Sequence, residues 1–458
     1  MSETQLGPLA VIRWGEADEQ RRGALLHRGV DAIFDRALQE GIREIVQDVR
    51  EHGDAAVSRA LKRFDGCDVA ADRLRVSDEE FDEAVSSIAP EMLAAARHAI
   101  RNLRAFNEYA TREREWRTET APGLVVGEKL TPIASAGLFV PSGKGSFPSV
   151  LTQLGVPALV AGVPEIAVVV PPVPGGSGEV DQAVLCIARE LGLTQVFRAN
   201  GPAGVAALAF GTETIPQVRK VVGPGSPPVQ AAQIQCQLFG CHTQMLCGPS
   251  ESLILADDSA DVRLLAADLL NEAEHGPDSS VVLVTSSERL LEAIQEEVAR
   301  QLAELPEPRR SYAQAALGQN GGCVLTADLD EGIDVANEYA PEHMQLVVDP
   351  AIEEATVARL YNAGELLIGQ YSPISAGNYT MGVPAALPTG GFAKVTSGIT
   401  AETFLKRTSI AKASPEALAE MTPSILAFAE HEGFPAHAAA ARIRPPVTAT
   451  GSNEVVAR

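Results

Sequence analysis

Short β-branched runs alternate with helical segments over two blocks of this 458-residue chain, and this alternation restricts the fold more than any other feature. The first block starts at about residue 125 and has apolar runs at 133–140, 166–170, 196–197 and 220–222. The second has runs at 252–256, 281–284, 322–326 and 345–348, separated by helical segments at 261–275, 287–303 and 329–338. A strand, a helix and a second strand form a βαβ unit with parallel strands. We therefore predict an α/β fold with two parallel-sheet modules.

Both ends of the chain are helical in pattern. Residues 42–64 and 78–107 carry apolar residues at helical spacing, and the last sixty or so residues are again helical. They end in a polar tail at 448–458, which we expect to be disordered.

Composition limits the possible partners and the compartment. The net charge of −23 argues against binding to nucleic acid or to an anionic membrane. Prolines interrupt the most apolar window, 156–174, so no membrane span is expected. The N-terminus lacks a signal-peptide pattern, and the six cysteines form no CxxC pair. These features predict a cytoplasmic protein with free thiols.

The stretch 267–278 combines a helical pattern with two residues suited to metal binding. Apolar residues recur at helical spacing from 262 to 273, and Ser259 or Asp261 can cap the helix. Glu272 and His275 stand three residues apart at its end, so they share one face and can converge on one ion. A Glu-x-x-His match also arises by chance on solvated helix faces, so the motif alone is a weak signal.

The distribution of the eight histidines strengthens that signal. His275, His343 and His437 each lie in a segment that contains Gly or Pro and a neighbouring carboxylate. The other five are better explained as surface or structural side chains.

Glu342 and His343 are the best candidates for acid–base chemistry. They follow Pro341 and precede an expected strand, which places both at a loop–strand junction. An imidazole that titrates near neutrality can take a hydroxyl proton, and an adjacent carboxylate can activate water. The alternative is a structural turn in which Glu342 is exposed.

Two glycine-rich loops are candidates for the border of a ligand cleft. Residues 137–146 resemble a phosphate loop, but Gly145 follows the Gly-Lys pair and the spacing is one residue too long. Residues 223–228 follow a strand, and open parallel sheets bind ligands at such strand ends. The chain has no Gly-x-Gly-x-x-Gly fingerprint, so motifs alone do not establish a dinucleotide site.

Ordered sequence blocks resemble the histidinol dehydrogenase family from roughly residue 40 to residue 442. The blocks are Ala-Gly-Leu-Phe-Val-Pro at 136–141, Ala-Ala-Leu-Ala-Phe-Gly-Thr at 206–212, Gly-Pro-Ser-Glu at 248–251, Asp-Leu-Leu-Asn-Glu-Ala-Glu-His-Gly-Pro-Asp at 268–278, Ala-Pro-Glu-His at 340–343, Ser-Pro-Ile-Ser-Ala-Gly-Asn-Tyr at 372–379, Leu-Pro-Thr-Gly-Gly at 387–391 and Glu-Gly-Phe-Pro-Ala-His at 432–437.

The resemblance implies a homodimeric, zinc-containing, NAD-dependent enzyme that oxidises an amino alcohol to the acid in two hydride transfers. It implies that His343 is the base in alcohol oxidation and that Glu342 activates water in the aldehyde step. The implied zinc ligands are Glu272, His275, Asn378 and His437, the last contributed by the partner subunit. The implied substrate contacts are Ser250, Glu432, His343 and the four zinc ligands.

Several positions depart from the family's pattern. The family carries Gln at the position of Glu272 and Asp at the position of Asn378, so carboxylate and amide are exchanged here. Because ligand charge and oxygen donors are retained, we still expect zinc. Pro384-Ala385 replaces an Asn-His pair that helps to hold substrate. Three cofactor-facing positions also differ: Phe139 for Tyr, Ala203 for Gln and Ser226 for Asn.

These departures leave several functions open. The first is oxidation of L-histidinol to L-histidine, and the second is oxidation of a different small alcohol by a divergent paralogue. A different class of function is a zinc-dependent hydrolase, or a metal-binding protein without redox activity. Titration with NAD and NADP would separate the dehydrogenases from the other class.

Pattern and resemblance together divide the chain into segments. We expect a helical extension at 1–38, a discontinuous first α/β domain at 39–135 and 252–398, and a second α/β domain on the nucleotide side at 136–251. A helical dimerisation segment follows at 399–445, then a disordered tail at 446–458. Both α/β domains are expected to be Rossmann-like, and the expected ligands are a small-molecule alcohol and NAD.

Overall fold

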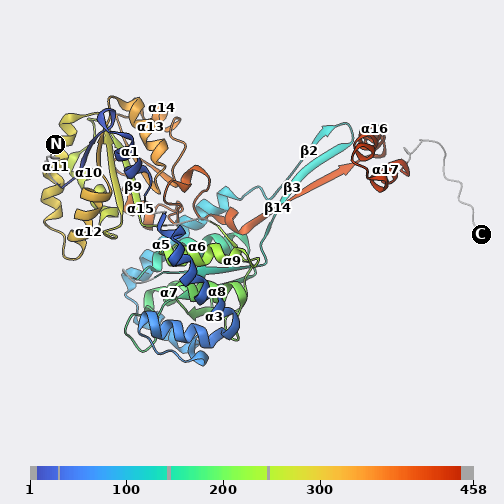
Figure 1. Ribbon diagram of the computed structural model, residues 1–458, viewed down its shortest axis with the longest axis horizontal. Coiled ribbons are helices and arrows are strands. Elements are labelled where there is room, and N and C mark those ends of the chain that lie inside the picture. Colours follow the sequence, from blue (N-terminus) through green and yellow to red (C-terminus); the bar gives the residue numbers. More distant parts are fainter. Residues whose placement is uncertain (1–7, 29–30, 142–145, 245–247, 445–458) are drawn as a thin grey trace, which may run out of the picture. The chain divides into compact units, whose positions relative to one another are not determined.

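The computed structural model describes residues 8–28, 31–141, 146–244 and 248–444 (Figure 1). The chain forms two compact units. The first comprises the chain up to Ala110 together with Ile133–Phe404, and the second comprises Thr111–Pro132 and the chain from Leu405 onward. The tail predicted at 446–458 lies outside the described residues. None of the described helices has the length and apolar character needed to cross a membrane.

The first unit contains a six-stranded parallel sheet in the order β1-β11-β10-β9-β12-β13. Its strands are β1 (Val11–Arg13), β9 (Glu251–Ala256), β10 (Ser280–Thr285), β11 (Gly322–Leu325), β12 (His343–Val347) and β13 (Glu365–Ile368). The four strands predicted for this block are present. The edge strand β1 lies inside the segment that was predicted to be a helical extension, and β13 was not predicted. Strands of three or four residues are too short to show a reliable periodicity.

Helices cover both faces of this sheet, which is why its strands are apolar on both sides. Val281 and Leu283 share one core with α10, α11 and α12, whereas Val282 and Val284 share another with α1 and α13. These helices and their short neighbours are α1 (Glu19–Leu26), α10 (Val262–Ala273), α11 (Glu288–Leu302), α12 (Arg309–Ala315), η4 (Ala316–Asn320), α13 (Leu329–Tyr339), α14 (Glu353–Val357) and α15 (Ile374–Tyr379).

The first unit also contains a five-stranded parallel sheet in the order β6-β5-β4-β7-β8. Its strands are β4 (Ser135–Phe139), β5 (Glu165–Val170), β6 (Val196–Arg198), β7 (Lys220–Val222) and β8 (His242–Thr243). The helices that pack around it are α2 (Asp31–Phe34), α3 (Arg36–Ala60), α4 (Asp78–Ser87), α5 (Pro90–Ala110), α6 (Pro148–Ala161), α7 (Gln182–Glu190), α8 (Gly201–Phe210) and α9 (Pro227–Gln237). Two parallel sheets covered by helices confirm the predicted α/β class.

Helix α3 packs against a different sheet from the one that the predicted domain division implied. It contacts α8 and α9, and its residues Val46 and Val57 join the core that contains Phe139 and Val169 of the five-stranded sheet. Residues 36–60 therefore pack with the five-stranded sheet and not with residues 252–398. An amphipathic pattern shows that one helix face must be buried, but it does not identify the sheet that buries it.

In both sheets, the order in which successive strands are added reverses in the middle of the sheet. From β4 the chain builds outward through β5 and β6, and β7 and β8 are then added on the other side of β4. The six-stranded sheet repeats this order, with β10 and β11 on one side of β9 and β12 and β13 on the other. Ligands of open parallel sheets bind where the strand order reverses, between β4 and β7 or between β9 and β12 here.

The second unit is a three-stranded antiparallel sheet followed by two helices. Its elements are β2 (Glu115–Ala121), β3 (Leu124–Pro132), β14 (Leu405–Ala413), α16 (Pro415–His431) and α17 (Pro435–Arg442). Strand β14 lies in the segment 399–445, which was predicted to be helical throughout. Most of its side chains are polar and exposed, so no apolar run marked it as a strand. The remaining short helices of the chain are η1 (Trp14–Glu16), η2 (Leu61–Asp65), η3 (Ala71–Arg73), η5 (Phe392–Lys394) and η6 (Ala401–Phe404).

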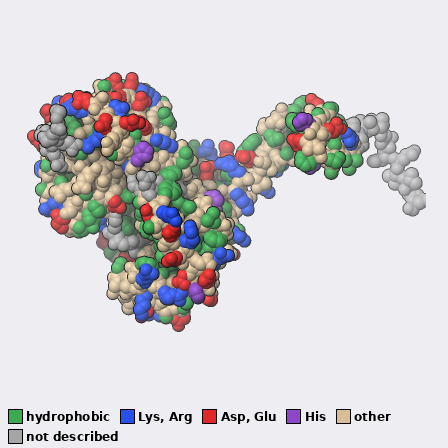
Figure 2. All heavy atoms as spheres, in the orientation of Figure 1, with side chains coloured by type: hydrophobic (Ala, Val, Ile, Leu, Met, Phe, Trp, Pro, Cys, Tyr) green, Lys and Arg blue, Asp and Glu red, His purple; other side chains and the backbone are tan. Residues whose placement is uncertain are grey.

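The described surface carries both signs of charge. On the face seen in Figure 2, acidic and basic side chains are interspersed over the first unit. The five described cysteines are free and buried, and Cys247 lies outside the described residues.

Candidate active site and metal site

Helix α10 delivers two of the predicted metal ligands. Its first turn is capped by Asp261, whose carboxylate accepts a hydrogen bond from the Arg263 backbone at 2.8 Å. The helix ends at Ala273, so Glu272 is enclosed in its last turn and His275 lies just beyond it. The Nδ1 atom of His275 lies 3.0 Å from Oε2 of Glu272. The predicted Glu-x-x-His pair therefore does converge.

Asn378 joins this pair from helix α15. Its side-chain amide donates to Oε1 of Glu272 at 3.0 Å, and the Asn271 amide donates to the same oxygen at 2.9 Å. We call Glu272, His275 and Asn378 the metal trio. They come from two elements about a hundred residues apart in sequence and meet around one buried carboxylate.

The charges of Glu272 and His275 stabilise each other. Burial would raise the pKa of the Glu272 carboxyl, but the His275 charge and hydrogen bonds from His275 and Asn378 outweigh it and hold that pKa at about 2. Burial would likewise lower the pKa of the His275 imidazole, but the Glu272 carboxylate raises it above its ordinary value. Glu272 is therefore an anion, which is the form in which a carboxyl group can bind a metal ion.

A sharp turn positions the predicted catalytic pair. Helix α13 ends at Tyr339 and is followed by Ala340, a buried residue with a positive φ of 51°, and Pro341 prevents the helix from continuing. Glu342 and His343 follow at the start of β12. The Glu251 backbone N–H donates to Oε2 of Glu342 at 3.0 Å, and Oε1 of Glu342 lies 3.9 Å from Nε2 of His343. The Glu342 side chain is only 13 % exposed, so the alternative of an exposed structural turn is wrong.

The environment changes the proton affinity of both residues. Burial raises the pKa of the Glu342 carboxyl to about 8, because it outweighs the attraction of His343. Burial alone would lower the pKa of the His343 imidazole, but the Glu272 charge and the hydrogen bond to Glu365 raise it to about 10. Two titratable groups with strongly shifted pKa values, side by side and enclosed, are typical of catalytic sites.

A buried ion pair supports the catalytic turn. The carboxylate of Glu251 accepts from Arg28 at 2.8 Å and from the Gly390 backbone at 2.7 Å. Arg28 also donates to the Tyr339 carbonyl at 2.9 Å and lies over the Tyr339 ring. Because the Glu251 backbone holds Glu342, this network fixes the position of the Glu342 side chain. No sequence pattern pointed to Arg28, which precedes Glu342 by more than three hundred residues.

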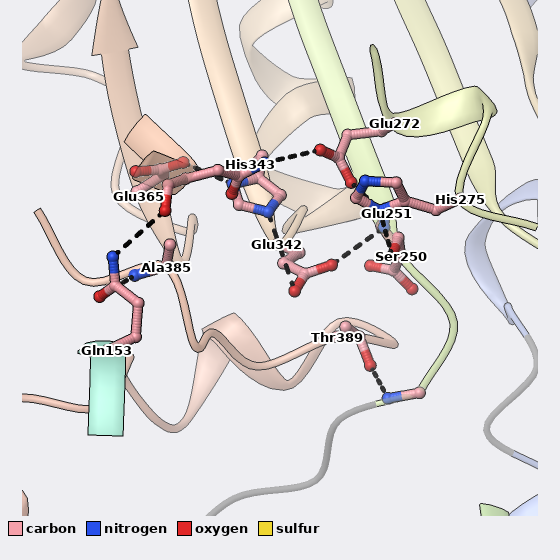
Figure 3. Close-up of polar contacts among 12 residues, drawn as sticks. Gln153, Ser250, Glu251, Glu272, His275, Glu342, His343, Glu365, Ala385 and Thr389 are labelled. Atoms are coloured by element: carbon pink, nitrogen blue, oxygen red, sulfur yellow. Dashed lines mark hydrogen bonds and ion pairs between the residues drawn. The ribbon is translucent and has the colours of Figure 1, made fainter. Parts of the chain in front are cut away.

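Ser250 connects the metal trio to the catalytic pair. Its hydroxyl lies 3.0 Å from Nδ1 of His275, and its neighbour Glu251 holds Glu342 (Figure 3). The structure thus brings together six of the predicted site residues: Ser250, Glu272, His275, Glu342, His343 and Asn378.

The site lies at the amino ends of the strands of the six-stranded sheet. Glu251, His343 and Glu365 are the first residues of β9, β12 and β13. The usual ligand position in such a sheet is at the carboxyl ends. The five-stranded sheet follows that rule, because the loops after β4 and β7 border a cavity of about 880 Å³. The same cavity is lined from the two sheets by Pro141, Phe147, Ser226, Ser250, His275 and Asn378.

The three predicted cofactor positions differ in location. Ser226 precedes α9 and lines the large cavity. Phe139 is fully buried in the core of the five-stranded sheet. Ala203 is also buried, and it borders a separate, small cavity of about 50 Å³ beside Asp65 and Asn200.

Gln153 lies next to Pro384-Ala385. Its side-chain oxygen accepts from the Ala385 backbone at 3.1 Å, and its amide donates to the Asn378 carbonyl at 3.4 Å. Gln153 lies on α6, which packs with the five-stranded sheet, and it lines the large cavity. It therefore links that sheet's helices to the helix that carries Asn378. Sequence reasoning gave no indication of this role.

The remaining two predicted residues belong to the second unit. Glu432 terminates α16 and His437 lies on α17, and both are exposed. The His437 ring packs against the Phe434 ring at a centroid distance of 5.1 Å. The contact of Glu432 with substrate and the contribution of His437 to the zinc site of the partner subunit stay predictions.

Comparisons with known proteins agree on one family. The family model for histidinol dehydrogenase matches residues 31–445. A histidinol dehydrogenase homolog from Colwellia psychrerythraea is 39% identical over 430 residues, which cover 93% of this chain and 95% of that protein. A histidinol dehydrogenase from Synechocystis is also 39% identical over 430 residues, covering 92% and 95%. The crystal structure of histidinol dehydrogenase from Elizabethkingia anophelis matches with a TM-score of 0.88 at 31% identity, covering 96% of this chain and 98% of that one.

Proposed function

Because this chain belongs to the histidinol dehydrogenase family, we propose that it oxidises a small alcohol through the aldehyde to the acid, with NAD as hydride acceptor and one zinc ion per subunit. The observation that carries the proposal is that the buried pair Glu342 and His343 lies next to the metal trio, two members of which, His275 and Asn378, line the large cavity. Acid–base groups next to metal donors that line a cavity suit the oxidation of a hydroxyl group.

The donor chemistry of the metal trio fits zinc. Glu272, His275 and Asn378 supply a carboxylate, an imidazole and an amide oxygen within hydrogen-bond distance of one another. Among the described residues, no group of three His, Cys, Asp and Glu side chains is arranged to hold a metal ion, and the third donor of the metal trio is an amide. We infer that His437 of the partner subunit supplies the fourth ligand. Bound zinc would act as a Lewis acid toward the substrate oxygen.

The large cavity fits a nicotinamide dinucleotide next to the substrate. It reaches the loops after β4 and β7, where the strand order reverses in a Rossmann-like sheet. Helices α6 and α9 begin at this edge, and helix N-termini favour the phosphates of a dinucleotide. On this proposal the five-stranded sheet is the nucleotide side, and NAD accepts the hydride.

The first half-reaction needs a base for the hydroxyl proton. His343 is that base: its Nδ1 faces Glu365, which leaves Nε2 to take the proton while the carbon gives up a hydride. The His343 imidazole is protonated at neutral pH in the chain without ligands, because its pKa is raised to about 10. Positive charge from a metal ion and an oxidised nicotinamide favours the neutral form that can act as a base.

The second half-reaction needs a water molecule. Glu342 removes a proton from this water molecule while the water oxygen adds to the aldehyde carbon. The hydrated aldehyde then gives up a second hydride to NAD. Oε2 of Glu342 accepts a hydrogen bond from the Glu251 backbone, so Oε1 of Glu342 is the oxygen available to water. Together the two steps consume one water and two oxidised nicotinamides for each alcohol.

Replacing His275 by alanine tests the metal assignment. The His275→Ala variant should lose zinc to less than about a tenth of wild-type content, because it retains a single imidazole, from His437 of the partner subunit, beside two oxygen donors. It should still fold, since His275 follows α10 and is 40% exposed. Elemental analysis and a thermal melt measure both properties, and His52→Ala, at an exposed histidine on α3, serves as the matched control. Full zinc occupancy in His275→Ala would remove the residue from the metal site.

The exchanged ligands are expected to act as a compensated pair. Glu272→Gln leaves no carboxylate in the trio, and Asn378→Asp places a second carboxylate at hydrogen-bond distance from Glu272. Each single change should weaken zinc binding about tenfold or more. The double variant restores one carboxylate and one amide and should recover much of the loss, as measured by competition with a chelator. Simple additivity would mean that the two residues do not share a metal.

The substrate is either L-histidinol or a different small alcohol. Pro384-Ala385 favours the second candidate, because it lacks the side-chain donors and acceptors of an Asn-His pair. The Ala385 backbone N–H already donates a hydrogen bond to the Gln153 side chain. Steady-state assays with L-histidinol and a panel of small alcohols, followed by the absorbance of reduced nicotinamide, decide between the two.

We propose that the enzyme is a homodimer. The second unit exposes large apolar side chains on or next to its helices, including Phe428 at 69%, Phe434 at 50% and Ile443 at 73%. Exposed apolar groups of this size are typical of protein interfaces. They lie on the segment that carries Glu432 and His437, so dimerisation through it would place these residues near a partner.

A further inference from the structure

Glu365 lies beside the catalytic histidine because of the sheet itself. Strands β12 and β13 are parallel neighbours, and their register pairs His343 with Glu365. The Glu365 backbone N–H donates to the Glu342 carbonyl at 3.1 Å, which locks this register. Paired residues of neighbouring strands project from the same face, and the Glu365 carboxylate accepts from Nδ1 of His343.

The carboxylate of Glu365 is enclosed and only half satisfied. Its side chain is 4% exposed, and its second oxygen, Oε2, has no hydrogen-bond partner within the described part of the chain. Its ion-pair partner there is His343. A buried carboxylate with an unsatisfied oxygen is destabilising unless a nearby positive charge compensates it. The most favourable state of this pair is therefore the one in which His343 carries a proton.

Helix α15 closes over this carboxylate. A Cβ atom on Gly377 would lie 3.0 Å from both oxygens of Glu365, so the backbone passes directly above the carboxylate. The next residue of that helix is Asn378 of the metal trio. Glu365 is thus seated between the catalytic histidine and the helix that carries a metal ligand.

We propose that Glu365 is a positioning residue for alcohol oxidation, which holds the His343 ring through Nδ1, presents Nε2 to the substrate and stabilises the imidazolium formed when His343 takes the hydroxyl proton. A carboxylate that orients a catalytic imidazole in a serine protease has the same effect. Other charged groups also act on His343, namely Glu272 and His275 at the end of α10 and Glu342 in the preceding turn. The inference rests on the proposed function, in which His343 is the base.

The Glu365→Gln substitution tests this role, because it keeps the size and one acceptor oxygen but removes the charge. We expect kcat for alcohol oxidation to fall about 10- to 100-fold with KM changed less than about threefold, as for other positioned acid–base groups. A base acts in its neutral form, and loss of a neighbouring anion lowers its pKa. The pH of half-maximal alcohol oxidation should therefore move downward, while zinc content stays unchanged.

Two further variants separate positioning from general stability. Leu367→Ala removes a buried side chain from the same strand without touching His343, so it should leave the pH of half-maximal rate unchanged. Glu365→Asp keeps the charge, and it should retain the native pH of half-maximal rate and more activity than Glu365→Gln. If Glu365→Gln does not fold, the comparison of Glu365→Asp with Leu367→Ala carries the test.

Three results would overturn the inference. The first is a native kcat and an unmoved pH profile in Glu365→Gln, and the second is a loss in that variant that Leu367→Ala reproduces with the same profile. The third applies if Glu365→Gln does not fold, and is a loss in Glu365→Asp no different from that in Leu367→Ala. A separate outcome concerns the proposed function: if His343→Asn is fully active, His343 is not the base, and the failure lies there rather than with Glu365.

Discussion

Replacing His343 by asparagine is expected to slow alcohol oxidation by about 10²–10⁴-fold, which is the usual contribution of a positioned acid or base. Asparagine can still donate a hydrogen bond to Glu365, but it has no nitrogen that accepts a proton at neutral pH. The fall should appear in kcat and in kcat/KM together, because the interaction is made mainly in the transition state.

The measurement is the initial rate of nicotinamide reduction with the alcohol as substrate, from which kcat and KM are derived. Zinc content should match that of the unaltered protein, since His343 is not part of the metal trio, whereas the melting temperature should fall, because buried Glu365 loses its compensating charge. His98→Asn, at an exposed histidine of α5, is the matched control for the substitution itself. A His343→Asn variant within a few-fold of native kcat would exclude His343 as the base.

The Glu342→Gln substitution should separate the two half-reactions. Oxidation of the aldehyde to the acid should fall about 10²–10³-fold, because glutamine cannot take a proton from water. Oxidation of the alcohol to the aldehyde should fall less than about tenfold, since His343 and the metal trio are unchanged. Two reduced nicotinamides per alcohol are expected from the unaltered enzyme, whereas Glu342→Gln should approach one and accumulate aldehyde.

The pH dependence provides a second signature of Glu342. Burial raises the pKa of its carboxyl to about 8, and a carboxyl acts as a base only after losing its proton. Aldehyde oxidation by the unaltered enzyme should therefore rise with pH as the carboxyl ionises, and Glu342→Gln should lose this rise. Assays that start from the alcohol and from the aldehyde measure both effects. Glu338→Gln, at an exposed position of α13, is the control, and equal losses in both half-reactions would argue against separate roles.

The sequence determined the fold class and several members of the site. Alternating β-branched runs and helical segments predicted parallel sheets, because the spacing of apolar residues along each element indicates which of its side chains are buried. The same periodicity placed Glu272 and His275 on one helix face, and their contact follows from local geometry alone. Pro341 and the expected strand placed Glu342 and His343 at a loop–strand junction, and Glu342 does precede β12 with His343 as its first residue. These features depend on residues that are close in sequence.

Tertiary structure decided the features that depend on distant residues. A buried helix face does not specify its partner, so the packing of α3 on the five-stranded sheet was not predictable. Strand order placed Glu365 beside His343, and the packing of the N-terminal segment brought Arg28 to Glu251. No local sequence motif indicates the role of Glu365 or of Glu251. Which elements become neighbours is decided by the packing of the whole chain, and a periodicity that extends over a single helix or strand carries no information about it.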